Sequence, residues 1–285
     1  MAIEIKPLTE TIGAEVIEID LSDTIDDATF SRIQNTFHEC GVLLFRDQHL
    51  SNEQHIAFSQ RFGDLEIHIA KQYLLKDHPE IVVLSNKVEN GKALGIEDAG
   101  RFWHSDLSYL PKPSLGSLLY AHEVPPVSAG GSTPFAGMYA AYDALDESLK
   151  EHIQDLTAIH SYEQRWQKDA ERGMQRSQLK QDEREKLPEV SHPIVRAHPI
   201  TGRKALYVNE GFTVRVEGMN ESESQKLLNE LFLHSTDPKF VYTHDWQAND
   251  LLMWDNACVI HSASWYDSSY IRHLHRTTIA GTVIN

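Results

Sequence analysis

The sequence predicts a mainly β protein with flanking helices, and three observations support this fold class. Short apolar runs that fit buried strands recur along the chain and dominate the segments that hold its candidate functional residues. Amphipathic helical patterns stand near the beginning and between the strands. No internal repeat or low-complexity linker interrupts the 285 residues, so one domain over 1–285 is the simplest organisation.

Two helices are expected near the beginning of the chain. The first covers Asp26 to Cys40 and is followed by Gly41, a residue type that commonly ends helices in the left-handed conformation. The second starts at Ser51, where Gln54 three residues later completes a capping box. Gly63 closes this second helix.

The remaining elements follow from apolar runs and helical periodicity between glycine- or proline-containing turns. Ser148 and Glu151 form a further capping box at the start of a later helix. The expected strands lie at 42–45, 81–84, 114–124, 205–208, 239–243, 250–254 and 271–280. The expected helices of the second half lie at 138–146, 148–156 and 221–234.

Two segments show no convincing periodicity. Residues 87–102 are polar and contain glycine, and we expect a mobile, lid-like loop there, because long loops in compact domains often serve as lids. Residues 163–189 are densely charged without a clear apolar face, which indicates a surface excursion or a helical insertion. Both segments are expected to shape the entrance to a site.

The composition is that of an ordinary globular protein. A formal net charge of −16 argues against nucleic-acid binding, which requires clustered lysine and arginine. No run of about 18 apolar residues could span a membrane, and no signal-peptide pattern is present. The only cysteines, Cys40 and Cys258, imply no disulfide framework. We therefore expect a cytoplasmic protein without nucleic-acid or membrane partners.

The segment Trp103-His104-Ser105-Asp106 contains the first functional signal. On a β-strand, the spacing of His104 and Asp106 places both side chains on the same face. His261 on a neighbouring strand would complete two histidines and one carboxylate around a metal, with the other positions left open as in non-haem Fe(II) oxygenases. A zinc hydrolase with a bound water could use the same three residues.

The strand expected at 271–280 contains the second signal. The two-residue period places Arg272, Leu274 and Arg276 on one face and Ile279 on the other. If Leu274 faces the interior, two arginines point inward, and each needs an anion because a guanidinium does not lose its charge. In the alternative orientation both arginines lie in solvent and Ile279 enters the core. Alternation alone does not decide between these two orientations.

Together these residues resemble the TauD/TfdA family of Fe(II)/2-oxoglutarate-dependent dioxygenases, which includes taurine dioxygenase and 2,4-dichlorophenoxyacetate dioxygenase. The similarity covers nearly the whole chain, and the motifs occur in the family's order and with its intervals. They are Val42-Leu43-Leu44-Phe45-Arg46, Phe62-Gly63-Asp64-Leu65-Glu66, Trp103-His104-Ser105-Asp106, Gly130-Gly131-Ser132-Thr133, Trp254-Asp255-Asn256 with His261, and Arg272 with Arg276.

The resemblance implies a double-stranded β-helix, or jelly roll, and a role for each site residue. His104, Asp106 and His261 match the family's iron ligands. Thr133 and Arg272 match the residues that bind the distal carboxylate of 2-oxoglutarate. Arg276 and His68 match the residues that contact the acidic head group of the substrate in taurine dioxygenase. One departure is Ala257, because the family often has arginine after Trp-Asp-Asn.

The resemblance also implies the reaction. With Fe(II), 2-oxoglutarate and O2, the enzyme would hydroxylate a small anionic organic acid of the sulfonate, alkyl sulfate or aryloxyalkanoate class, often with collapse of the product to an aldehyde. Another carboxylate or a natural product is the alternative substrate. A zinc hydrolase and a non-catalytic metal-binding jelly roll are the rival classes. Relatives suggest a homo-oligomer, either a dimer or a tetramer.

Overall fold

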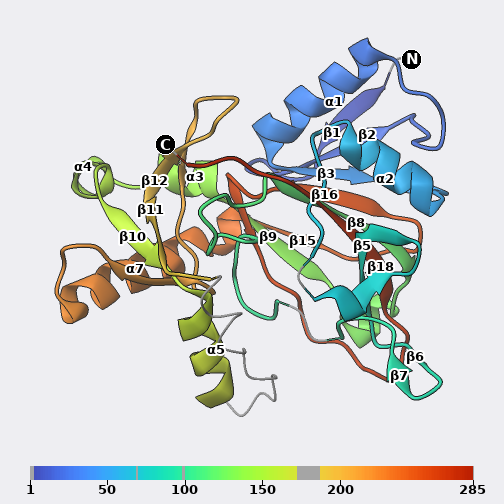
Figure 1. Cartoon of the computed structure of the whole chain (residues 1–285). Helices are drawn as coiled ribbons and strands as arrows, with labels where there is room; N and C mark the ends of the chain where they lie inside the picture. Colours follow the sequence, from blue (N-terminus) through green and yellow to red (C-terminus); the bar gives the residue numbers. More distant parts are fainter. Residues whose placement is uncertain (1–2, 69, 98–99, 172–186, 285) are drawn as a thin grey trace.

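Two facing β-sheets form the centre of the protein, whose computed structural model describes residues 3–68, 70–97, 100–171 and 187–284 (Figure 1). The larger sheet has eight strands, antiparallel except where β2 pairs with β3. In spatial order they are β1 (Glu4–Pro7), β2 (Ala14–Ile17), β3 (Val42–Phe45), β16 (Leu251–Asp255), β8 (Gly116–Glu123), β18 (His273–Ile279), β5 (His78–Ser85) and β4 (Leu74–Leu75). The smaller facing sheet contains β15 (Val241–His244), β9 (Thr133–Gly137) and β17 (Val259–His261).

The larger sheet is buried on both faces. In β16, Leu252 and Trp254 point into the interior between the sheets, whereas Leu251 and Met253 point to the opposite face. This opposite face packs against α1 (Asp27–Cys40) and α2 (Asn52–Gln60), which lie together over the sheet in Figure 1. Because both faces are covered, these strands form continuous apolar runs in the sequence, as strands buried on both faces do.

The capping signals of the two N-terminal helices are confirmed. The Asp26 side chain accepts a hydrogen bond from the Thr29 amide, and Gly41 has the left-handed conformation, with φ of 74°. At α2, Ser51 and Gln54 form the expected capping box, although the helix ends at Gln60, before Gly63. These local hydrogen bonds satisfy backbone groups at the helix ends that have no partner within the helix.

A second group of elements packs beside the sheets, on the left of Figure 1. Its helices are α3 (Met138–Asp143), α4 (Glu147–Ile153), α5 (Tyr162–Glu171) and α7 (Glu221–Ser235). Its strands are β10 (Thr157–His160), β11 (Val190–Pro193), β12 (Val195–Ala197), β13 (Lys204–Leu206) and β14 (Thr213–Val216). No helix in the described ranges is long and apolar enough to cross a membrane.

One sequence expectation in these regions is wrong, and two others concern segments that lie partly outside the described residues. The predicted capping box of Ser148 with Glu151 is wrong, because Asp146 caps α4 and the Ser148 hydroxyl donates to its carboxylate. The 87–102 loop contains a hairpin of β6 (Val88–Glu89) and β7 (Lys92–Ala93); its residues 98–99 are outside the described part, and its role as a lid stays a prediction. The 163–189 segment overlaps α5, and its residues 172–186 are likewise outside the described residues.

Histidines accumulate on the face of the larger sheet that α2 covers. The rings of His122 and His275 are 4.2 Å apart, and those of His273 and His275 are 5.0 Å apart. Burial, reinforced by neighbouring imidazoles, lowers the pKa of His55 and His275 to about 3 and that of His122 to about 4. The nearby charged or titratable side chains are Lys87, Glu123, Glu53 and His78.

We predict that this histidine layer makes the fold sensitive to acid. Unfolded histidines titrate near pH 6.5, so between this value and about pH 4 the unfolded chain binds more protons than the folded one. The free energy of unfolding therefore decreases as the pH is lowered through this range. Fully buried His55 would contribute a slope of at most about 1.4 kcal/mol per pH unit. Urea unfolding at pH 7, 6 and 5 measures the slope. His55→Leu should flatten it and the exposed control His152→Leu should not. Equal stability of the wild type at all three pH values would contradict the prediction.

Candidate active site

Two histidines from distant segments form a backbone pair. The amide of His104 donates to the carbonyl of His261 at 2.9 Å, and the amide of His261 donates to that of His104 at 2.8 Å. This pair is an isolated antiparallel bridge, and Asp106 lies in the following turn rather than on a strand. The prediction of a regular His-x-Asp strand is therefore wrong. The turn, rather than strand alternation, brings Asp106 back beside the two histidines.

His104, Asp106 and His261 converge on one point. The Oδ1 atom of Asp106 lies 3.6 Å from Nε2 of His104 and 4.0 Å from Nε2 of His261. These separations are too long for hydrogen bonds. They are close to the ~3 Å that separates adjacent ligands of a metal with bonds of about 2.1 Å. The three buried residues could therefore hold a divalent metal ion with small adjustments.

The surroundings fix the orientation of both imidazoles. Nδ1 of His104 bonds to the carbonyl oxygen of Phe102 at 2.8 Å, which assigns the proton to Nδ1 and leaves the Nε2 lone pair facing Asp106. Outer hydrogen bonds of this kind are usual for histidines that bind metals. The His261 ring packs on Trp254, with centroids 4.6 Å apart, and stacks on Phe135.

Asp106 is buried and ionised. Burial opposes its ionisation, but the charge of Arg276 and the imidazoles of His261 and His104 outweigh it and hold the pKa of Asp106 well below its usual range. Its Oδ2 accepts a hydrogen bond of 2.7 Å from the Ser117 hydroxyl, which leaves Oδ1 directed at the histidines. An ionised carboxylate with one oxygen directed at two imidazoles is suited to a metal.

A cavity beside the two histidines contains Arg272 and Thr133, as the resemblance implied. Burial lowers the pKa of Arg272 to about 10, so the guanidinium remains charged at neutral pH. Within the described residues no carboxylate lies within 4.0 Å of it. Thr133 Oγ1 accepts a hydrogen bond of 2.9 Å from Trp246, so its own proton remains available to a ligand. The pair forms a receptor for an anion.

Trp246 belongs to a buried support for Thr133. Its ring lies edge-on to His244, at 4.6 Å between centroids, and Nε2 of His244 is 3.0 Å from the carboxylate of Asp250. Asp250 directly precedes β16 and also pairs with Arg46 at 2.7 Å. The position of Thr133 is therefore fixed, through Trp246 and His244, by the carboxylate that precedes β16.

Arg276 lines the same cavity, with Nη1 3.4 Å from Oδ1 of Asp106. Both arginines thus face the interior with Leu274, while Ile279 packs under α1 and α2. Because the strand is buried on both faces, alternation could not show which face points inward.

His68 lies outside the cavity lining but within electrostatic range of Arg276. Burial and the Arg276 charge lower the pKa of His68 to about 4. Its Nδ1 accepts the Ala70 amide proton, so Nε2 is the donor.

Sequence reasoning missed two contributors to the site. Asn256 contacts the turn that contains Asp106: its Oδ1 accepts the Asp106 amide proton, and its carbonyl oxygen accepts the Ser105 hydroxyl proton. Gly100 lies against His104, where an added Cβ would be 2.6 Å from Cε1 and 3.1 Å from Nε2. Asn256 was visible only as part of a motif, and Gly100 only as one glycine in an irregular loop.

Two histidines and one carboxylate that converge beside a cavity with two guanidinium groups are typical of metal-dependent oxygenases. A family model, "Taurine catabolism dioxygenase TauD, TfdA family", matches residues 4–278. The chain belongs to this family. The expectations of a jelly-roll fold and a dioxygenase are confirmed.

Similar proteins agree with this assignment. A Sphingobium herbicidovorans protein named (S)-phenoxypropionate/alpha-ketoglutarate-dioxygenase is 37% identical, over 98% of this chain and 96% of its own. The alpha-ketoglutarate-dependent 2,4-dichlorophenoxyacetate dioxygenase of Cupriavidus pinatubonensis is 35% identical, over 98% of both chains. Among solved structures, AAD-2 in complex with Mn(II) and N-oxalylglycine matches with a TM-score of 0.83 and 33% identity, over 100% of this chain and 99% of that one.

We predict that Gly100→Ala weakens metal binding at least tenfold, because the new methyl group would overlap the metal-facing edge of His104. Gly218→Ala is the matched control: φ is 72° at Gly100 and 75° at Gly218, but nothing lies within 4 Å of the Cβ position at Gly218. Both variants incur the strain of about 1 kcal/mol of a left-handed alanine. Titration with Mn(II), followed by electron paramagnetic resonance, measures the affinities. Equal affinities in the two variants would refute the steric explanation.

Proposed function

We propose that the protein is an Fe(II)- and 2-oxoglutarate-dependent dioxygenase that hydroxylates a small organic carboxylate of the aryloxyalkanoate class. The observation that supports this most strongly is the cavity in which two guanidinium groups lie beside a preformed set of metal ligands. Two inward cations suit two separate anions, and this reaction uses two: the co-substrate and the substrate.

His104, Asp106 and His261 would hold the iron, and Thr133 with Arg272 would hold the distal carboxylate of 2-oxoglutarate. Iron and 2-oxoglutarate supply oxidation chemistry that consumes O2 and converts 2-oxoglutarate to succinate and CO2. The protein orients these groups: Arg272 offers a charged fork and Thr133 a hydroxyl proton, which together match one carboxylate. Trp254 and Leu119, which line the cavity, limit its contact with water.

Arg276 would bind the acidic head of the substrate. Its guanidinium is only 3.4 Å from a carboxylate oxygen of Asp106, so a substrate anion held there lies beside the metal-binding residues. His68 would assist through its Nε2 proton, which a neutral imidazole retains above its lowered pKa.

The aryloxyalkanoate class is supported by the names of the two relatives described above and, secondarily, by aromatic side chains beside His104. The Phe212 ring is 6.1 Å from that of His104 and 4.7 Å from that of Tyr109. Tyr162 extends this wall, 4.8 Å from Tyr109. These three rings do not line the cavity itself, and they would contact an aryl ring only where a substrate extends past His104. Sulfonates and alkyl sulfates have the same anionic handle without the ring.

We also propose that the protein is cytoplasmic and forms a dimer or tetramer. Free cysteines at Cys40 and Cys258 fit a reducing compartment. The oligomer is suggested by relatives and is measured by light scattering of the purified protein.

Activity distinguishes the proposal from a zinc hydrolase. We expect succinate formation that requires both Fe(II) and 2-oxoglutarate and is stimulated most by aryloxyalkanoates in a panel that also contains sulfonates, alkyl sulfates and other carboxylates. A zinc hydrolase would need neither 2-oxoglutarate nor O2. The absence of substrate-stimulated succinate across the panel would overturn the proposed function, and stimulation by sulfonates alone would overturn the substrate class.

The two arginines should have separable roles. We expect Arg272→Ala to abolish 2-oxoglutarate binding, with at least a hundredfold weaker affinity by calorimetry, while Mn(II) binding is kept. Arg276→Ala should keep 2-oxoglutarate affinity within about threefold and lose substrate stimulation, because Arg276 would contact the substrate and not the co-substrate. The hundredfold loss at Arg272 corresponds to two charge-assisted hydrogen bonds of about 1.5–3 kcal/mol each. The assignment fails if the two variants exchange these effects, or if Arg272→Ala loses the metal.

A further inference from the structure

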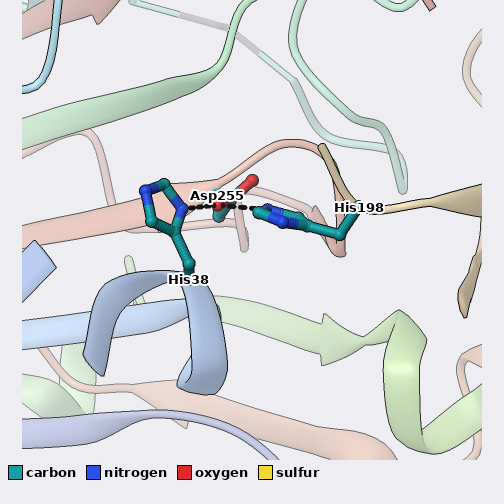
Figure 2. A group of neighbouring side chains, drawn as sticks. All are labelled: His38, His198 and Asp255. Atoms are coloured by element: carbon teal, nitrogen blue, oxygen red, sulfur yellow. Dashed lines mark hydrogen bonds and ion pairs between the residues drawn. The ribbon is translucent and has the colours of Figure 1, made fainter. Parts of the chain in front are cut away.

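A second group of two histidines and one carboxylate is buried outside the active site (Figure 2). His38 projects from the last turn of α1, His198 follows β12, and Asp255 lies between them at the end of β16. One carboxylate oxygen, Oδ2 of Asp255, is 2.8 Å from Nδ1 of His38 and 2.9 Å from Nε2 of His198. All three side chains are essentially inaccessible to solvent.

The geometry of this group is that of hydrogen bonds rather than of a metal site. Its distances are about 1 Å shorter than those between Asp106 and its histidines, and each leaves room for a proton only. Nδ1 of His198 accepts two backbone amide protons, from Ile200 and Thr201. Its proton must therefore be on Nε2, the atom that faces Asp255, and this atom has no lone pair for a metal.

The two histidines hold Asp255 in its ionised form. Burial alone would raise the pKa of this carboxyl group, but the hydrogen bonds from His198 and His38 outweigh it and lower the pKa below the usual range. The second oxygen, Oδ1, accepts the amide proton of Ala257 at 2.9 Å, which closes a tight turn directly after β16. Both oxygens of this buried carboxylate thus accept hydrogen bonds.

The turn that Asp255 closes presents Asn256 to the metal-binding turn. The Asn256 carbonyl oxygen is 2.8 Å from the Ser105 hydroxyl, and its Oδ1 is 3.2 Å from the Asp106 amide. Its Nδ2 donates to Ser114, whose hydroxyl in turn donates to the carbonyl of Asp106. Asn256 therefore clamps the backbone of Asp106 from both sides, and Asp255 fixes the position of Asn256.

We propose that His38 and His198 are positioning residues for the metal site: by donating to Asp255 they fix Asn256, and through it the Asp106 carboxylate. The inference rests on the proposed role of Asp106 as a metal ligand. It connects metal affinity to α1 and to the segment after β12, two elements that contribute no ligand.

The test compares variants that remove the donated proton with variants that keep it. Leucine at either histidine removes the donor. Asparagine at 38 and glutamine at 198 place an N–H near Nδ1 and Nε2, respectively. We expect His38→Leu and His198→Leu to bind Mn(II) about five- to tenfold more weakly than the wild type. His38→Asn and His198→Gln should bind within twofold of it. His55→Leu, which removes a buried histidine of α2 that contacts Thr277, should bind normally.

The outcomes separate this inference from the proposed function. Failure of the wild type to bind Mn(II), or unchanged binding by Asp106→Ala, would refute the metal site itself. Normal binding by the wild type and by folded leucine variants would refute the positioning role alone, as would asparagine and glutamine variants as weak as the leucine ones. If the leucine variants do not fold, Asp255→Asn keeps the volume but replaces one acceptor oxygen. Unchanged Mn(II) affinity in that variant would also overturn the proposal.

Discussion

Ionic charge inside a closed apolar interior is the constraint on which this structure depends. Asp106 can be ionised there because Arg276 and two imidazoles face it, and Arg272 keeps its charge although no carboxylate among the described residues neutralises it. A buried cation without an internal partner costs stability unless a ligand supplies the anion. The scaffold therefore tolerates local instability at the proposed co-substrate site, which is typical of functional sites.

Much of the site could be predicted from the sequence because its residues occur in short motifs. His104, Asp106, His261, Thr133, Arg272 and Arg276 all lie around one cavity or one ligand set, as expected. The route by which they meet could not be predicted. Asp106 reaches the site through a turn, and the two histidines meet through a single β-bridge between segments more than 150 residues apart. Periodicity describes regular elements, and these positions are outside them.

The fold was predictable where a strand is buried on both faces and less so elsewhere. Continuous apolar runs such as Val42–Phe45 and Leu251–Asp255 identified central strands. The strands Glu4–Pro7, at the edge of the sheet, and Ala14–Ile17, beside it, were missed, since partial exposure mixes charged residues into their pattern. For the last strand, helices cover the outer face and the cavity occupies the inner one, so tertiary packing decided an orientation that alternation left open.

Strand β16 lies between two buried carboxylates that support different parts of the site. Asp250, directly before the strand, is hydrogen-bonded to His244 and so holds Trp246 against Thr133. Asp255, at the end of the strand, is hydrogen-bonded to two histidines and holds Asn256 against Asp106. The strand spans five residues. The proposed co-substrate and metal sites are thus supported from opposite ends of one short strand. The two supports have no residue in common, so a substitution in one leaves the hydrogen bonds of the other in place.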